Sequence, residues 1–179
     1  VLPAWRPDKA MNLEKPEYPE YMKTLSEVSG VEIKCFADLK LALSKRMDYF
    51  AEVGCCVSDH ALEYVMYAPA TEETVDAIFK KALNGEKITR EEEMTFKTAY
   101  MQFVGKEYHK RNWVMQIHYG CKRDNNAFMY EQLGPDTGYD CINNYAPSAQ
   151  TADFLNSLIA TNELPKTILY SLNPNDNEA

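Results

Sequence analysis

Three residues that could carry chemistry, Arg6, Asp59 and His118, each stand at the end of a short apolar run. An arginine guanidinium can hold a carboxylate or a phosphate through two parallel hydrogen bonds. A carboxylate can act as a general base or bind a substrate hydroxyl. An imidazole can move a proton, ligate a metal or bond a substrate oxygen. These residue types indicate an enzyme.

Each of the three has a structural alternative that the local pattern leaves open. Arg6 could form a salt bridge with Asp8 instead of binding a ligand. Asp59 could cap a helix that begins at His60, a role compatible with chemistry. A lone histidine such as His118 is more often a structural residue. The sequence has no H-x-H, H-E-x-x-H, Walker or G-x-G-x-x-G motif, so it contains no complete metal or nucleotide site.

Four apolar runs separated by helical patterns predict the strands that position these side chains. Alternation of strand and helix implies right-handed crossovers and a parallel sheet. We therefore expect an α/β fold of about four βα units, with Arg6, Asp59 and His118 converging on a cleft at the carboxyl ends of the strands. The runs, with their polar ends, cover residues 1–8, 55–60, 113–118 and 166–174.

The stretch between the second and third runs predicts helices. Two glutamates follow Thr71, and Thr89 forms a capping-box pattern with Glu92, which are both signals of helix starts. We expect residues 61–112 to form a helical insertion within a single partial domain of residues 1–179.

Composition limits the partners that this chain can have. It has 27 acidic and 19 basic residues and a net charge of −8, so it lacks the basic surface that binds nucleic acid or an anionic membrane. No apolar run approaches the ~20 residues of a membrane-spanning helix. Five cysteines without a C-x-x-C pair indicate reduced thiols and a cytoplasmic protein. A chain of 179 residues is shorter than the roughly 250 of a closed eight-stranded α/β barrel.

Four segments of the chain closely resemble the uronate (glucuronate) isomerases of the amidohydrolase superfamily, in order and at similar spacing. The resemblance implies the middle portion, strands about three to six, of a (β/α)₈ TIM-type barrel. It also implies an enzyme that interconverts D-glucuronate with D-fructuronate, and D-galacturonate with D-tagaturonate, in bacterial hexuronate breakdown. The segments are WRPDKA at 5–10, VSDHAL at 57–62, WVMQIHYG at 113–120 and LPKTILYSLNP at 164–174.

The resemblance also implies roles for individual residues. Arg6 would anchor the uronate carboxylate, and Asp59 would assist proton transfer at the sugar oxygens. His118 would lie near the metal and the substrate carbonyl or hydroxyl. Arg123 is a further candidate for substrate binding, in a loop where Asp124 stands in place of the family's usual Asn.

The same resemblance implies a divalent metal, expected to be zinc, in the full enzyme. Its main ligands, a His-x-His pair and an Asp on other strands, are absent from this sequence. The expected partners are a small uronate sugar and further copies of the chain in a homo-oligomer. Two alternatives stay open: an isolated, non-catalytic half-barrel that self-associates, and a metal-dependent hydrolase of the same superfamily. We expect the chain by itself to be inactive.

Overall fold

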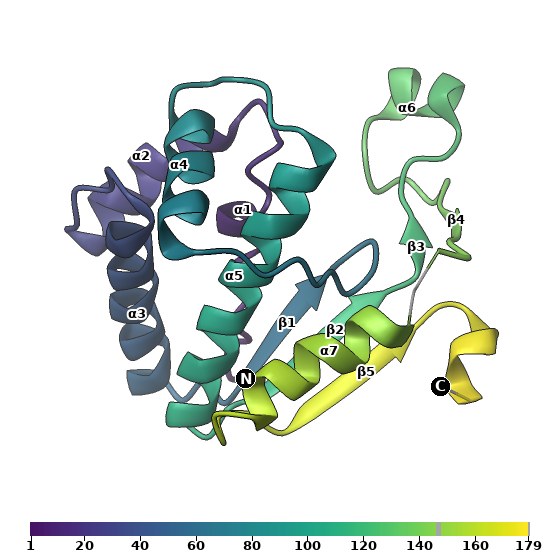
Figure 1. The fold of residues 1–179 in the computed structure, drawn as a ribbon. Coiled ribbons are helices and arrows are strands. Elements are labelled where there is room, and N and C mark those ends of the chain that lie inside the picture. Colours follow the sequence, from purple (N-terminus) through teal and green to yellow (C-terminus); the bar gives the residue numbers. More distant parts are fainter. Residues whose placement is uncertain (146–147, 179) are drawn as a thin grey trace.

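The chain folds into a parallel sheet flanked by helices, in a computed structural model that describes residues 1–145 and 148–178 (Figure 1). The strands are β1 (Val57–Ala61), β2 (Val114–Tyr119), β3 (Cys121–Lys122), β4 (Cys141–Ile142) and β5 (Thr167–Ser171). The helices are α1 (Asp8–Met11), α2 (Tyr18–Ser29), α3 (Phe36–Glu52), α4 (Glu72–Leu83), α5 (Arg90–Lys110), α6 (Ala127–Leu133) and α7 (Ser148–Ile159), followed by a 3₁₀ helix, η1 (Pro174–Glu178).

The main sheet has the order β1-β2-β5, and both pairs of strands are parallel. The strands therefore lie side by side in the order in which they occur along the chain, with helices between them. This order is typical of the wall of an α/β barrel, whereas a doubly wound sheet reverses its order at a switch point. The predicted α/β class and parallel sheet are confirmed.

The first apolar run, residues 1–8, forms a single bridge instead of the predicted strand. The main sheet therefore has three strands and not four. Trp5 donates its N–H to the Val57 carbonyl at 3.0 Å and accepts from the Asp59 N–H at 2.9 Å, which places it beside the edge of β1. The next ladder positions on either side of Trp5 fall on Pro3 and Pro7. Proline has no N–H to donate, so the pairing with β1 does not extend beyond Trp5 in either direction.

The predicted helix starts between β1 and β2 are confirmed. The Thr71 side chain accepts from the Thr74 N–H at the start of α4. Thr89 and Glu92 form both hydrogen bonds of the capping box at the start of α5. None of the helices in the described residues is long and apolar enough to span a membrane.

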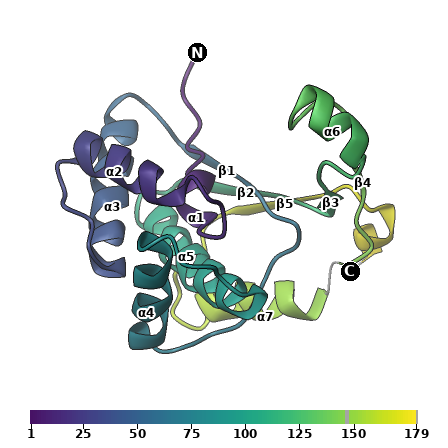
Figure 2. The same cartoon turned by 90° about the horizontal axis from the view of Figure 1, so that it is seen from above.

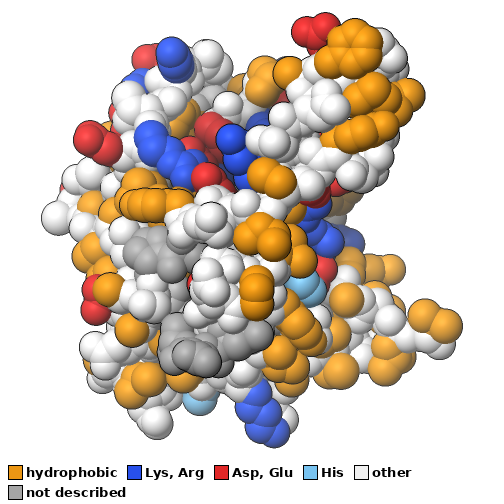
Figure 3. Space-filling model, turned by 90° about the vertical axis from the view of Figure 1, so that its right-hand side faces the viewer, with side chains coloured by type: hydrophobic (Ala, Val, Ile, Leu, Met, Phe, Trp, Pro, Cys, Tyr) orange, Lys and Arg blue, Asp and Glu red, His pale blue; other side chains and the backbone are white. Residues whose placement is uncertain are grey.

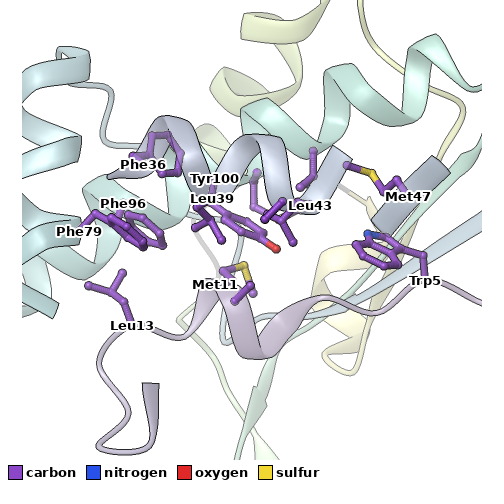
Figure 4. Packing of buried hydrophobic residues seen from close by; sticks show 14 of the residues in the cluster. Trp5, Met11, Leu13, Phe36, Leu39, Leu43, Met47, Phe79, Phe96 and Tyr100 are labelled. Atoms are coloured by element: carbon purple, nitrogen blue, oxygen red, sulfur yellow. The ribbon is translucent and has the colours of Figure 1, made fainter. Parts of the chain in front are cut away.

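Helices α3, α4 and α5 pack around a core of aromatic and aliphatic side chains (Figure 4). Phe79 of α4 and Phe96 of α5 stack with ring centroids 5.9 Å apart, and Phe36 of α3 meets Phe96 edge-on at 5.4 Å. Burial of each such ring stabilises the fold by about 1.5–3 kcal/mol. Trp5 packs against Phe50 at the end of α3, so the same core holds the bridge beside β1 in place.

The two faces of the sheet have different surroundings. Figure 2 shows α5 and α7 on one side of it. Successive side chains of a strand point to opposite faces. Met115 and Ile117 of β2 are buried on the helix side, while Ile168 and Tyr170 of β5 are each 41% exposed. At β2 and β5, the face away from the helices is therefore open.

A small projection leaves the sheet after β2. The antiparallel pair β3 and β4 carries α6 at its tip, away from the main sheet (Figure 1). Phe128 and Leu133 of α6 are exposed, and hydrophobic side chains gather on this part of the surface (Figure 3, upper right). Arg123 lies within this projection, in the segment between β3 and α6.

Candidate active site

The structure brings Arg6, Asp59 and His118 into direct contact. Arg6 Nη1 lies 3.0 Å from Asp59 Oδ2, and His118 Nδ1 lies 2.7 Å from Asp59 Oδ1. Arg6 Nε also lies 3.2 Å from Asp8 Oδ2. A guanidinium, two carboxylates and an imidazole therefore form one continuous line of charged or ionisable groups.

Strand register explains why Asp59 and His118 meet. The partner of His118 across the sheet is Ala61, two residues after Asp59, so Asp59 and His118 are diagonal neighbours on the same face. Asp59 lies in the middle of β1, and His118 lies one residue before the end of β2. Arg6 follows the Trp5 bridge, so its side chain reaches β1 from the edge of the sheet.

The helix-capping alternative for Asp59 is wrong. β1 continues through His60 to Ala61, and no helix begins at His60. Because a strand alternates its side chains, Asp59 points to the open face while His60 is fully buried on the helix side. The hydrogen bonds of the ladder to β2 keep this segment extended.

Arg6 makes ion pairs with two carboxylates. It forms the salt bridge to Asp8 that was the structural alternative, and it also contacts Asp59. Its side chain remains 52% exposed. These contacts use Nε and Nη1, and within the described part of the chain Nη2 has no hydrogen-bond partner, so the guanidinium can still donate to a ligand.

Asp8 is a site residue that the sequence analysis did not select. Its side chain is only 14% exposed, and it accepts hydrogen bonds from the Ala61 N–H at 3.0 Å and from Arg6, while His60 Nδ1 lies 3.0 Å away. Burial by itself would raise the pKa of Asp8, but His60, the Ala61 N–H and Arg6 together hold that pKa below its usual value. Asp8 is therefore a carboxylate at neutral pH. The only signal in the sequence was its place directly after Arg6-Pro7.

His118 is held from two sides. Its ring stacks on Tyr170, its partner in the register with β5, with centroids 4.4 Å apart and planes 8° from parallel. Nδ1 faces Asp59, at a distance that makes an ion pair when His118 is protonated but without hydrogen-bond alignment. Nε2 has no partner in the described part of the chain, and the side chain is 48% exposed. Tyr170 was not predicted, because only the register places it beside His118.

Arg123 lies apart from these residues. Its guanidinium contacts Asp140 at 2.8 Å and Asp136 at 3.8 Å, both in the projection that carries α6. Asp124 donates its N–H to Asp140 and adopts a left-handed backbone, with φ of 51°. Asn and Asp both tolerate this conformation, so an Asp in place of the family's usual Asn keeps the turn.

The expected cleft is not closed around Arg6, Asp59 and His118. These side chains lie on the open face of the sheet. One cavity of about 320 Å³ is lined by residues of α2 and by Lys9, Asn12 and Lys15, and another of about 510 Å³ is lined by residues of α4 with Glu92. Neither is lined by the three candidate residues.

A parallel α/β sheet that gathers Arg, Asp and His on its open face has the architecture of an α/β enzyme. A profile of the glucuronate isomerase family matches residues 1–179, and the chain belongs to this family. It is 68% identical over 179 residues to a uronate isomerase of Lachnospira eligens and 62% identical to one of Lachnoclostridium phytofermentans. Each match covers all of this chain and 38% of the relative, so the chain spans well under half of their length.

Solved structures give the same result. The uronate isomerase of Thermotoga maritima matches with a TM-score of 0.91 and 35% identity, over 98% of this chain and 38% of that one. The glucuronate isomerase of Caulobacter crescentus matches with a TM-score of 0.86 and 25% identity, over 97% of this chain and 36% of that one. These neighbours are TIM-barrel enzymes, so the parallel sheet corresponds to part of a barrel wall.

The family is consistent with a metal-dependent enzyme, but this chain does not provide a metal site by itself. The described residues contain no group of three or more His, Cys, Asp or Glu side chains that could hold a metal ion. Asp59 and His118 alone fall short of the three protein ligands of a catalytic zinc site.

Proposed function

We propose that this chain is part of an aldose-ketose isomerase that interconverts D-glucuronate with D-fructuronate, and D-galacturonate with D-tagaturonate, in hexuronate catabolism. The observation that carries the proposal is the match of the whole chain to the family. The structure also brings Arg6, Asp59 and His118 into contact. The reaction moves a proton between C2 and C1 of the open-chain sugar and needs stabilisation of the oxygen where negative charge develops. It also needs the substrate to be held in one orientation.

Arg6 is the proposed anchor for the uronate carboxylate. Its planar guanidinium suits a carboxylate, and Asp8 and Asp59 fix its orientation before substrate binds. Asp8 and Asp59 already neutralise the charge of Arg6. The uronate carboxylate is therefore bound through the remaining N–H donors of the guanidinium, in the orientation that the two carboxylates fix. A hexuronate held this way presents the opposite end of its carbon chain to the reacting groups.

His118 is the proposed group at the substrate oxygens. Asp59 faces Nδ1 and Tyr170 supports the ring, which leaves Nε2 for the substrate. An imidazole oriented by a carboxylate is a common arrangement for proton transfer. Asp59 then assists transfer at the sugar oxygens through His118, and Arg123 is retained as a second substrate-binding candidate from the adjacent loop.

In the full enzyme, we propose that a divalent metal, zinc, would complete the site, where its Lewis acidity would polarise the substrate oxygens. Its main ligands would come from parts of the enzyme outside this chain, because the described residues contain no group of three or more side chains that could hold a metal ion. We also propose that the enzyme is a cytoplasmic homo-oligomer. The net charge of −8 supports the absence of a nucleic-acid or anionic-membrane partner.

The test is an assay of the full-length enzyme that contains this chain, with D-glucuronate and D-galacturonate in the presence of added Zn²⁺, followed by proton NMR. We expect signals of the corresponding 2-keto sugars to appear until equilibrium is reached. Hydrolysis of amide or ester substrates without isomerisation would instead support the hydrolase alternative.

The 179-residue chain alone is the matched control for the assay. We expect no turnover from it, because the His-x-His pair and the Asp proposed as the main metal ligands are absent from its sequence. Light scattering should show self-association, since Ile168 and Tyr170 leave apolar surface exposed on the open face. Turnover by a monomer of this chain would contradict the assigned roles.

A further inference from the structure

Two fully buried residues, His60 and Tyr108, lie behind the site and have no part in the proposed reaction. His60 Nδ1 lies 3.0 Å from Asp8 Oδ1, and His60 Nε2 lies 2.9 Å from the Tyr108 hydroxyl. Tyr108 belongs to α5 and His60 to β1, so the contact joins the main helix to the edge of the sheet.

The protonation states of Tyr108 and Asp8 determine which atom donates in each of these hydrogen bonds. Burial raises the pKa of Tyr108 well above its usual value, so the phenol keeps its proton. Asp8 is a carboxylate, which can only accept, and Nδ1 of His60 must therefore donate to it. In the neutral ring, Nε2 then accepts the hydroxyl proton of Tyr108. With a neutral His60, each member therefore donates to the next, from Tyr108 through His60 to Asp8.

Asp8 connects the contacts on the helix side of the sheet to Arg6. One oxygen faces His60 on the helix side. The other oxygen accepts from the Ala61 N–H and from Arg6 Nε. The Ala61 N–H lies beyond the part of β1 that pairs with Trp5. Arg6 in turn contacts Asp59 on the open face. The position of the guanidinium therefore depends on how the Asp8 carboxylate is held from behind.

We propose that His60 and Tyr108 are positioning residues that fix the Asp8 carboxylate and, through it, the orientation of Arg6. This inference rests on the proposed role of Arg6 as the carboxylate anchor. A buried histidine with a purely structural role would not affect substrate binding. Loss of the hydrogen bond from His60 to Asp8 should instead weaken binding of the uronate carboxylate.

The test compares variants of the full-length enzyme. His60→Asn keeps a donor at the position of Nδ1, His60→Leu removes it, and Tyr108→Phe removes only the hydroxyl. Tyr18→Phe is the matched control, because Tyr18 is also fully buried but donates to the Ala10 carbonyl instead. Two measurements are made. Steady-state kinetics give KM and kcat for D-glucuronate, and NMR of nitrogen-15-labelled arginine without substrate gives the exchange rate of the Arg6 Nε–H.

We expect His60→Leu to raise KM about tenfold, with a smaller change in kcat, because the hydrogen bond that it loses involves a charged group. It should also speed exchange of the Arg6 Nε–H. His60→Asn should restore both quantities nearly to wild type. Tyr108→Phe should lie between them, and Tyr18→Phe should change neither.

Unchanged KM and unchanged Arg6 exchange in a folded His60→Leu enzyme overturn the proposal. If His60→Leu does not fold, Tyr108→Phe decides the matter by the same two measurements. If the wild-type enzyme has no isomerase activity, the proposed function fails, while the exchange rates still test the positioning of Arg6 independently.

Discussion

Asp59 Oδ1 lies 2.7 Å from His118 Nδ1, although the two residues are not partners in the register of the sheet. The same carboxylate places its other oxygen 3.0 Å from Arg6. Asp59 therefore links the proposed carboxylate anchor to the proposed proton-transfer group, and changes at this position should affect the two functions differently.

Replacing Asp59 with Asn should lower kcat without raising KM. His118 loses the carboxylate that orients it, and general acid-base contributions are typically about 10²–10⁴-fold, so we expect kcat to fall about a hundredfold. KM should stay equal or fall, because removal of a negative charge beside Arg6 favours an anionic substrate. Steady-state kinetics of the full-length enzyme test this, with the exposed Asp153→Asn as control. A raised KM with normal kcat would show that Asp59 only holds Arg6.

Replacing Arg6 with Met should mainly raise KM. The variant keeps an unbranched side chain but loses the donors to a carboxylate, and hydrogen bonds to charged groups contribute about 1.5–3 kcal/mol. This corresponds to a rise in KM of roughly ten- to a hundredfold. Arg46→Met serves as control, since Arg46 lies on α3 over the ring of Tyr49. Equal KM values in the two variants would exclude Arg6 as the anchor.

Tyr170 should act through its ring and not through its hydroxyl. Tyr170→Phe keeps the stack on His118 and should leave kcat within about twofold of wild type, whereas Tyr170→Leu removes it. Aromatic pairs contribute about 0.5–1.5 kcal/mol beyond burial, so we expect kcat to fall about two- to tenfold in Tyr170→Leu. The kinetics of both variants give the answer, and a loss of activity in Tyr170→Phe would point instead to a role for the hydroxyl.

The lowered pKa of Asp8 predicts a pH dependence of stability. A carboxylate with a depressed pKa in the folded state stabilises the protein above its unfolded pKa, near 3.8, and loses this contribution as the pH falls through the folded value. At neutral pH, Asp8→Asn should lower the free energy of unfolding by about 1.5–3 kcal/mol, because it weakens hydrogen bonds to a charged group.

The difference between wild type and Asp8→Asn should therefore shrink as the pH is lowered below 4. Urea unfolding of both proteins at a series of pH values measures this difference. A difference that is constant with pH would mean that Asp8 is not more acidic in the folded protein.

The elements with local sequence signals could be predicted without the structure. The caps at Thr71 and Thr89 were predictable because their hydrogen bonds join residues three positions apart. The apolar run of β2 was predictable because the side chains buried on its helix side, Met115 and Ile117, are apolar. By contrast, β1 buries Ser58 and His60 there, and β5 has no buried side chain. Arg6, Asp59 and His118 were found because each stands beside such a run, and the resemblance to the family followed from the same segments.

The surroundings of these residues follow from long-range contacts that no local pattern shows. Asp8 and His60 are 52 residues apart and His60 and Tyr108 are 48 apart, so nothing local joins them. Tyr170 meets His118 only through the register of β5 against β2. Register and helix packing depend on burial summed over the whole chain, and for that reason the residues that hold the site are set by the fold rather than by any short pattern in the sequence.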